Sequence, residues 1–388
     1  MNRRIDVGYV PLLDAAPLII AAEMGFAAEE GLELAMQREL SWAALRDRLI
    51  WGGYHAAHML APVVVAQTAG IGVGDAAIDA LMVLSVNGNM IGAEPGLATA
   101  IAATGCGFLD AGATGRALAA TLGGRPLRLG VPFPLSMHAA LVDYWLARSG
   151  LAGGVDLVKV PPPRMASAMA GGEIDAFCVG EPWGSVAVEM GAAQLILPGA
   201  AIWQFAPEKV LAMSRATVEA EPDRAAALMR AVWRAARWLG DPENAMTAAE
   251  LAGGAAYLDV APEILERTLT GRLVVDGHGR EVRVPRAIDF FTGAASFPWR
   301  SQALWIAEAL ARSTGADRAP LRAAARNDAR ADLFRSVLGP VGADLPGASE
   351  KLEGAMATPT AVASTLGRLM LGPDRFFDGQ VFDPMDGD

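Results

Sequence analysis

Short apolar segments alternate with amphipathic stretches along the first part of the chain. Brief apolar and β-branched runs predict strands, and apolar residues three or four apart predict helices. The pattern predicts strands at 5–10, 32–39 and 81–86, a short strand or turn at 56–62, and helices at 15–24 and after the candidate N-cap Ser41. Such alternation is typical of a mostly parallel sheet with helices on both faces.

A second alternating series begins near Gly92. It predicts strands at 127–131, 155–160, 176–179 and 195–197, and helices at 136–147, 164–170 and 182–190. The series spans about 100 residues, which is a usual size for one domain. We therefore predict a second α/β unit.

From about Trp203 the chain is predicted to return to the first unit, with a strand at 209–213 and a helix at 224–239. The rest is mostly helical, apart from an irregular piece at 276–286 and an extended tail at 371–388. The predicted domains are 1–91 and 201–310 for the first lobe, 92–200 for the second, and 311–388 for a C-terminal helical extension and tail. Such a path is typical of proteins that close two lobes on a ligand in the cleft between them.

The composition fits a protein with a sizeable core. Hydrophobic residues make up 53% and charged residues 19% of the chain, which argues against disorder and coiled coil. The net charge is 32 − 43 = −11, so no basic surface for direct binding of nucleic acid is predicted. Two cysteines and four histidines supply neither a disulfide framework nor a multi-ligand metal site. We expect no cofactor and no metal.

The N-terminal sequence favours a protein without an export signal. Asp6, Pro11 and Asp14 interrupt the apolar stretch that follows Arg3 and Arg4, and no early cysteine offers a lipid attachment site. No run of about 20 uncharged apolar residues stands out, so no membrane span is predicted. We expect a cytoplasmic protein.

Three motifs together carry a family resemblance. They are the Phe-Pro pair ahead of His138, the Val-Pro-Pro-Pro run at 160–163, and Val-Gly-Glu-Pro-Trp at 179–183. The chain resembles the nitrate- and bicarbonate-binding proteins of cyanobacterial ABC transporters, the NrtA/CmpA family, over about residues 5–310. The resemblance implies an α/β, two-lobed periplasmic-binding-protein-like fold of type II, with a ligand cleft between the lobes and extra C-terminal helices.

The resemblance also implies a set of ligand-binding residues. They are Trp42, His138, Gly180 and Lys209, with an amide from Asn89 or Asn87 where the family has Gln. We prefer Asn89 for that amide, although its shorter side chain reaches less far than Gln. The bicarbonate-binding relatives have an acidic residue at the position of Lys209, so the lysine favours nitrate or nitrite.

The chemistry of these residues agrees with the resemblance. Nitrate is a planar monoanion whose oxygens only accept hydrogen bonds, so its site needs N–H donors and one positive charge. Lys209 supplies a compact cation. His138 begins a predicted helix, where the helix dipole favours anions. No catalytic nucleophile is required, and we expect no catalytic residues.

Each candidate also has a plain structural interpretation. Trp42 is typical of a core residue, His138 of a helix cap, and Lys209 beside Glu208 of a surface charge. The Asn87-Gly88-Asn89 segment is typical of a turn, and Gly180 of a turn glycine after a strand. The resemblance raises the weight of the binding hypothesis for all of them.

Three functions compete. The first is a cytoplasmic nitrate/nitrite sensor that resembles NasS and releases an ANTAR-domain RNA-binding antiterminator, similar to NasT, when the anion binds. The second is the solute-binding subunit of an ABC importer for nitrate, nitrite or bicarbonate. The third is an enzyme similar to the pyrimidine synthases of thiamin biosynthesis. That enzyme needs a cysteine-rich iron motif, which Cys106 and Cys178 are too far apart to form, so we predict a protein that is not an enzyme.

Overall fold

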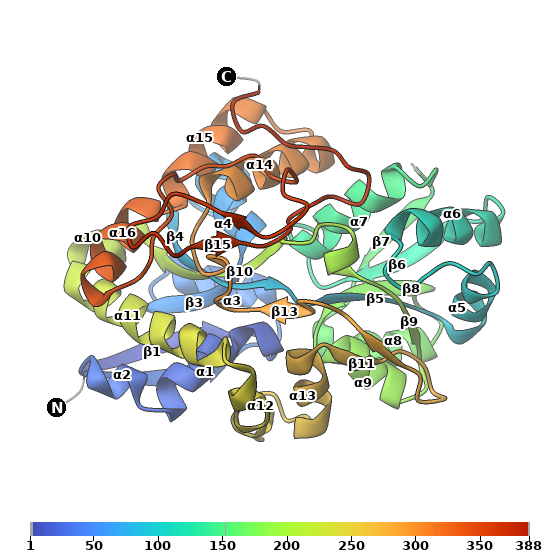
Figure 1. The fold of residues 1–388 in the computed structure, drawn as a ribbon, viewed down its shortest axis with the longest axis horizontal. Helices are drawn as coiled ribbons and strands as arrows, with labels where there is room; N and C mark the ends of the chain where they lie inside the picture. The colour runs from blue at the N-terminus through green and yellow to red at the C-terminus, as the bar shows by residue number, and fades with distance from the viewer. Residues whose placement is uncertain (1–2, 152, 387–388) are drawn as a thin grey trace.

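The computed structural model describes residues 3–151 and 153–386, and it builds two sheet-containing lobes (Figure 1). The sheet of the first lobe has six strands in the order β13-β4-β10-β3-β1-β2. These strands are β1 (Arg3–Tyr9), β2 (Leu32–Arg38), β3 (Ala56–Leu60), β4 (Ile78–Asn87), β10 (Pro207–Ser214) and β13 (Ile288–Asp289). The helices of this lobe before residue 271 are α1 (Ala16–Glu23), α2 (Phe26–Glu29), α3 (Trp42–Ile50), α4 (Ala61–Ala66), α10 (Arg215–Ala220), α11 (Pro222–Leu239), α12 (Ala245–Gly253) and α13 (Pro262–Thr270).

The second lobe holds a five-stranded sheet in the order β7-β6-β8-β5-β9. Its strands are β5 (Asn89–Ala93), β6 (Leu127–Val131), β7 (Val155–Lys159), β8 (Ala176–Gly180) and β9 (Gln194–Pro198). Its helices are α5 (Pro95–Ala102), α6 (Ala111–Leu122), α7 (Met137–Ala147), α8 (Met165–Ala170) and α9 (Trp183–Glu189).

The two sheets are mixed, so the prediction of mostly parallel sheets is wrong. β1 is parallel to β2 and β3, and β6 is parallel to β7 and β8. β10 runs antiparallel to β3 and β4, and β5 runs antiparallel to β8 and β9. The reason is that β5 and β10 each enter a lobe from the other lobe rather than through a helical crossover within one sheet.

Three segments cross between the lobes side by side. The chain leaves β4 for β5 through Gly88, whose φ of 94° lies in the left-handed region that glycine adopts without strain. The Gly88 N–H donates to the Ala287 carbonyl at 2.7 Å, and the Asn87 N–H donates to the Ala206 carbonyl at 2.8 Å. These bonds join the outward crossing to both returning segments.

The last hundred residues cover the first lobe and reach the second. They contain α14 (Arg300–Thr314), α15 (Arg318–Asp328), α16 (Ala331–Leu338) and the short strands β14 (Thr360–Ala361) and β15 (Met370–Leu371). The chain after β15 runs from the first lobe toward α7 (Figure 1). There Asp378 accepts hydrogen bonds from the Tyr144 hydroxyl at 2.9 Å and pairs with Arg148 Nε at 2.6 Å.

A hairpin makes a further link between the lobes. Its strands are β11 (Arg272–Val274) and β12 (Glu281–Arg283). Leu273 and Val284 pack into the same apolar cluster as Phe177 and Leu195 of the second sheet. The region predicted as irregular therefore carries part of a hairpin that covers the second lobe.

Most predicted elements are confirmed to within a few residues, and the two-lobed α/β fold is confirmed. Sequence reasoning missed β5, α5 and α6. The domain boundaries stay predictions, although the chain changes sheet at Gly88, a few residues before the predicted start of the second unit. Within the described residues, the helices lack the length and apolar character that a membrane span requires.

Candidate ligand-binding site

A buried cluster of charged side chains lies where the two lobes meet. Glu208 and Lys209 lie on β10, and both are completely buried. His58 lies on the neighbouring strand β3, opposite Leu211. Asp14 lies in a 3-10 helix at Leu13–Ala15 that follows β1. The segment that carries Asp14 contacts the second lobe, because the Leu13 N–H donates a hydrogen bond to the Glu181 carbonyl at 2.8 Å.

Lys209 is held between two carboxylates. Its Nζ lies 2.7 Å from Asp14 Oδ2 and 3.0 Å from Glu208 Oε2. On its other side, Asp14 Oδ1 lies 2.7 Å from His58 Nε2. The sequence interpretation of Lys209 as a surface charge is therefore wrong, because a chain return through β10 places it in the interior.

The pKa shifts follow from burial and from these contacts. Burial alone would lower the pKa of Lys209, but Asp14 and Glu208 outweigh it and the pKa is raised. Burial raises the pKa of Asp14, and the positive charge of Lys209 together with His58 reverses that effect, so the net pKa is lowered. Burial dominates at Glu208 and raises its pKa to about 7. Lys209 and Asp14 thus form the charged pair, and Glu208 changes charge near neutral pH.

The second lobe brings Asn89 and Gly180 to the same cluster. The Asn89 amide donates to Glu208 Oε1, which is a contact between the lobes. Gly180 lies opposite Asn89 in the β5–β8 ladder. A Cβ added to Gly180 would lie 3.6 Å from Asn89 Oδ1 and 3.6 Å from Asp14 Oδ2, so its backbone faces the charged cluster closely.

Trp42 and His138 bring polar atoms that the protein itself leaves unpaired. The Ser41 and Ser136 hydroxyls cap α3 and α7, which begin at Trp42 and one residue before His138. Within residues 3–151 and 153–386, Trp42 Nε1 and both ring nitrogens of His138 are buried without a hydrogen-bond partner. Buried polar groups are normally paired, so these atoms indicate a place for a small polar ligand.

Trp42 and His138 also lie within reach of the charges. The Trp42 ring lies 5.7 Å from Lys209 Nζ, and its centroid lies 5.5 Å from that of His58. Burial lowers the pKa of His138 well below its usual value, and the charge of Lys209 lowers it further. His138 is therefore a neutral imidazole with one N–H to donate.

Asn87 does not face this cluster. Its Nδ2 donates to the Gln204 and Arg286 carbonyls at 3.1 and 3.0 Å, and its Oδ1 accepts from the Ala206 N–H at 3.3 Å. The side chain is fully used in joining the three crossing segments. Of the two asparagines, only Asn89 is placed to meet a ligand beside Lys209.

The predicted ligand-binding residues do not include Asp14, Glu208 or His58. The available signal was position: Asp14 directly follows a buried strand, and Glu208 shares a buried apolar strand with Lys209. A charged residue in such a place is rarely buried unless it is paired. Among the described residues, no group of three or more His, Cys, Asp or Glu side chains is arranged to hold a metal ion.

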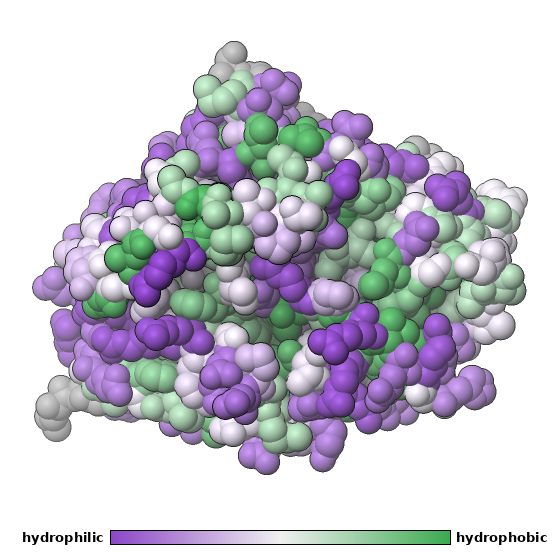
Figure 2. Space-filling view, in the orientation of Figure 1, coloured by the Kyte–Doolittle hydropathy of each residue, from purple (hydrophilic) through white to green (hydrophobic). Residues whose placement is uncertain are grey.

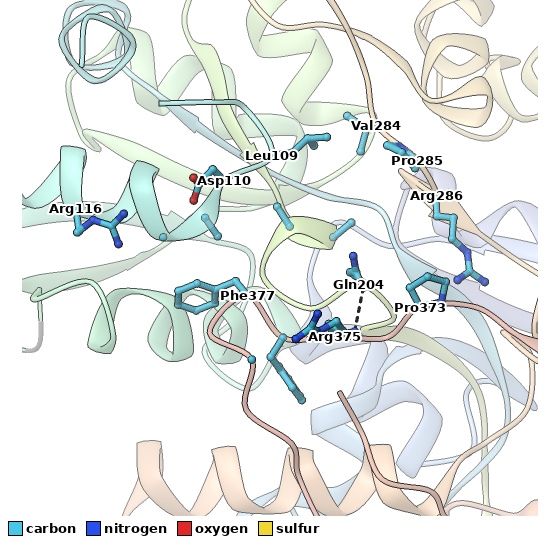
Figure 3. A pocket seen from close by; sticks show the side chains of 16 residues that line it. Leu109, Asp110, Arg116, Gln204, Val284, Pro285, Arg286, Pro373, Arg375 and Phe377 are labelled. Carbon is cyan, nitrogen blue, oxygen red and sulfur yellow. Dashed lines mark hydrogen bonds between the residues drawn. The ribbon is translucent and has the colours of Figure 1, made fainter. Parts of the chain in front are cut away.

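A separate cavity of about 790 Å³ opens beside the crossing segments (Figure 3). The space-filling view shows this face hollowed between the lobes (Figure 2). Arg116, Gln204, Arg286 and Arg375 line the cavity, and the Arg375 N–H donates to Gln204 Oε1 at 3.1 Å. The residues described as lining it include none of the predicted ligand-binding residues. The charged cluster therefore lies apart from this cavity.

The two lobes, with a buried charged cluster between them, have the fold of the two-lobed solute-binding proteins. The crystal structure of the periplasmic nitrate-binding protein NrtA from Synechocystis has the same fold, with a TM-score of 0.85 at 24% identity over 99% of this chain and 96% of that one. Residues 2–253 match the NMT1-like family, and the chain belongs to this family, alongside the NrtA and CmpA proteins.

Three relatives illustrate the similarity. The nitrate/nitrite binding protein NrtA of Nostoc sp. is 31% identical over 311 residues, which are 78% of this chain and 69% of NrtA. The bicarbonate-binding protein CmpA of Synechococcus elongatus is 28% identical over 408 aligned residues, covering 98% of this chain and 84% of CmpA. The chain spans less than half, 46%, of NrtC of Synechocystis sp., a nitrate import ATP-binding protein that is 33% identical over 316 residues. NrtA and CmpA are binding proteins, which agrees with the prediction that the chain is not an enzyme.

Proposed function

We propose that this protein binds a small planar oxyanion, nitrate or nitrite, as the solute-binding component of an ABC importer. The observation that carries the proposal is the completely buried Lys209 at the junction of the lobes, with two unpaired polar side chains, Trp42 and His138, close by in the described part of the chain. A cation with N–H donors around it is what an acceptor-only anion needs. The similarity to the nitrate/nitrite binding protein NrtA supports the choice of ligand, and the similarity to the nitrate import protein NrtC supports a role in import.

Bicarbonate is the alternative ligand. Asp14 and Glu208 both face Lys209, and a carboxylate accepts a hydrogen bond from the O–H of bicarbonate but repels every oxygen of nitrate. The positive charge of Lys209, with the N–H donors of Trp42 and His138, instead favours an anion whose oxygens only accept hydrogen bonds, such as nitrate or nitrite. Nitrate, nitrite and bicarbonate therefore belong in the same experiment.

A cytoplasmic sensor is a second proposal. In this reading the same site binds the anion, and lobe closure releases an ANTAR-domain antiterminator that docks through a basic surface. The net charge of −11 supports an interaction with a basic partner. In a capture experiment, we expect the protein to bind an ANTAR-domain protein and to release it when nitrate or nitrite is added. Capture that does not respond to either anion counts against the sensor function.

Thermal unfolding tests the binding function directly. A ligand that binds only the folded state raises the melting temperature by mass action. We expect nitrate or nitrite, at a hundredfold excess over its Kd, to raise the melting temperature by about 3 °C or more. Chloride and sulfate at equal ionic strength serve as controls. Equal melting temperatures with all the anions would contradict the proposal.

A further inference from the structure

We propose that the Asp14 carboxylate is a built-in competitor that occupies the place of the bound oxyanion beside Lys209, so that the ligand binds only by displacing it. The inference rests on the proposed function, because it concerns the same site. It assigns a specificity-determining role to a residue outside the set that the family resemblance supplied.

The position of Asp14 carries this inference. Its Oδ2 lies 2.7 Å from Lys209 Nζ, the distance of a direct ion pair. A Cβ on Gly180 would lie 3.6 Å from the same oxygen. Its Oδ1 lies 2.7 Å from His58 Nε2, and the His58 ring packs against Trp42. The carboxylate thus lies among Lys209, Gly180 and Trp42, which are residues proposed to surround the anion.

The chemistry of the two anions is also alike. A carboxylate and a nitrate or nitrite ion are planar, carry one negative charge and offer oxygen acceptors to the same N–H donors. Each forms an ion pair with the Lys209 ammonium and accepts a hydrogen bond from it. A side chain that makes these contacts therefore competes with the ligand for a single partner rather than adding to its binding.

The charge balance rules out simultaneous occupancy. Lys209 already faces Asp14 and Glu208, and all three side chains are buried. His58 and His138 add no full positive charge, because burial lowers the pKa of both. A further anion beside an undisplaced Asp14 would leave more negative than positive charge in a medium of low dielectric, which is strongly unfavourable.

The fold gives Asp14 a way to leave. It lies in a three-residue 3-10 helix between β1 and α1, where the backbone is tied through Leu13 rather than through Asp14 itself. Rotation of this one short side chain separates its carboxylate from Lys209 and from His58 without disturbing a strand. The affinity for the ligand then depends on how much more strongly Lys209 interacts with the ligand than with the Asp14 carboxylate.

Substitution of Asp14 provides the test. We expect Asp14→Asn to bind nitrate or nitrite about tenfold more tightly than the wild type, because the competing charge is gone. Asp6→Asn is the matched control, since it removes one negative charge from a partly exposed position on β1, and its affinity should match the wild type. A gain in affinity separates competition from a structural role, because damage to the site weakens binding. Weaker or unchanged binding by Asp14→Asn overturns the inference.

If Asp14→Asn does not fold, a structure of the wild-type protein with the anion bound provides the test. The expected result is an anion oxygen within about 3 Å of Lys209 Nζ and the Asp14 carboxylate turned away. An anion bound while Asp14 keeps its contact with Lys209 overturns the inference and leaves the proposed function standing. Binding of none of the three anions by either protein overturns the proposed function as well.

Discussion

Lys209 keeps its positive charge in the interior because two carboxylates face it. Removal of one member of a buried ion pair costs about 3–5 kcal/mol, since it leaves the other charge unpaired. We expect Lys209→Gln to lower the free energy of unfolding by this amount, and Asp14→Asn added to it to restore part of the loss. Urea unfolding of the two single variants and the double variant measures the coupling. Strictly additive losses would contradict the pairing.

Glu181 gives a pH-dependent prediction. Burial raises its pKa to about 7, above the ordinary value of 4.5. The folded protein therefore holds a proton that the unfolded chain has lost between these values, and stability falls as pH rises through this window. We expect Glu181→Gln to gain up to about 3 kcal/mol relative to the wild type between pH 5 and pH 8.

Denaturant unfolding at several pH values measures this gain. Glu173→Gln, at an exposed position of the same lobe, should follow the wild type at every pH. A Glu181→Gln protein whose stability tracks the wild type across the window would show that Glu181 is ionised in the folded state.

At the scale of elements, the cap of α3 was predicted from the sequence and the crossing strand β5 was not. Ser41 precedes an apolar helical pattern and accepts the N–H of Ala44, as expected for a cap. β5 begins at the Asn87-Gly88-Asn89 segment, which is typical of a turn, yet its partners β8 and β9 lie far along the chain. Local pattern carries no information about such partners, so the strand and the mixed sheets were missed.

The cap of α7 places His138, which leads to a prediction. The Ser136 hydroxyl accepts from the Ala139 N–H at 3.2 Å and donates to the Phe133 carbonyl at 2.5 Å. Ser136→Ala should cost about 1 kcal/mol of stability and weaken anion binding several-fold, because the first turn that carries His138 loosens. Ser214→Ala removes a similar cap, that of α10, away from the site. It should cost similar stability and leave affinity unchanged; equal affinity in both variants would contradict the role of the cap.

For the site, the family motifs led to the Trp42, Asn89, Gly180 and Lys209 neighbourhood, and the structure adds Asp14 and Glu208. No motif marks those two carboxylates. Their role depends on β10 returning between β3 and β4, which places Glu208 and Lys209 next to the end of β1. Only the assembled sheet brings these charges together.

At the scale of the whole molecule, the segment that follows β15 contacts both lobes and links them. Asp378 contacts Tyr144 of α7 and Arg148 just after it, and Phe376 stacks on Trp203 at a centroid distance of 4.7 Å. We expect Asp378→Ala to shift the protein toward an open form, with a larger radius of gyration by small-angle X-ray scattering and weaker anion binding. Asp386→Ala, in the same segment at an exposed position, is the control. An unchanged radius and affinity for Asp378→Ala would show that the segment does not restrain the lobes.

Calorimetric titration tests most directly whether the buried Lys209 cluster is the anion site. Wild type, Lys209→Gln and the exposed-lysine control Lys159→Gln are each titrated with nitrate, nitrite and bicarbonate. We expect wild type and Lys159→Gln to bind nitrate or nitrite at about micromolar Kd, and a folded Lys209→Gln to bind at least about 100-fold more weakly. Equal affinity in Lys209→Gln and wild type, or binding of none of the three anions, would contradict it.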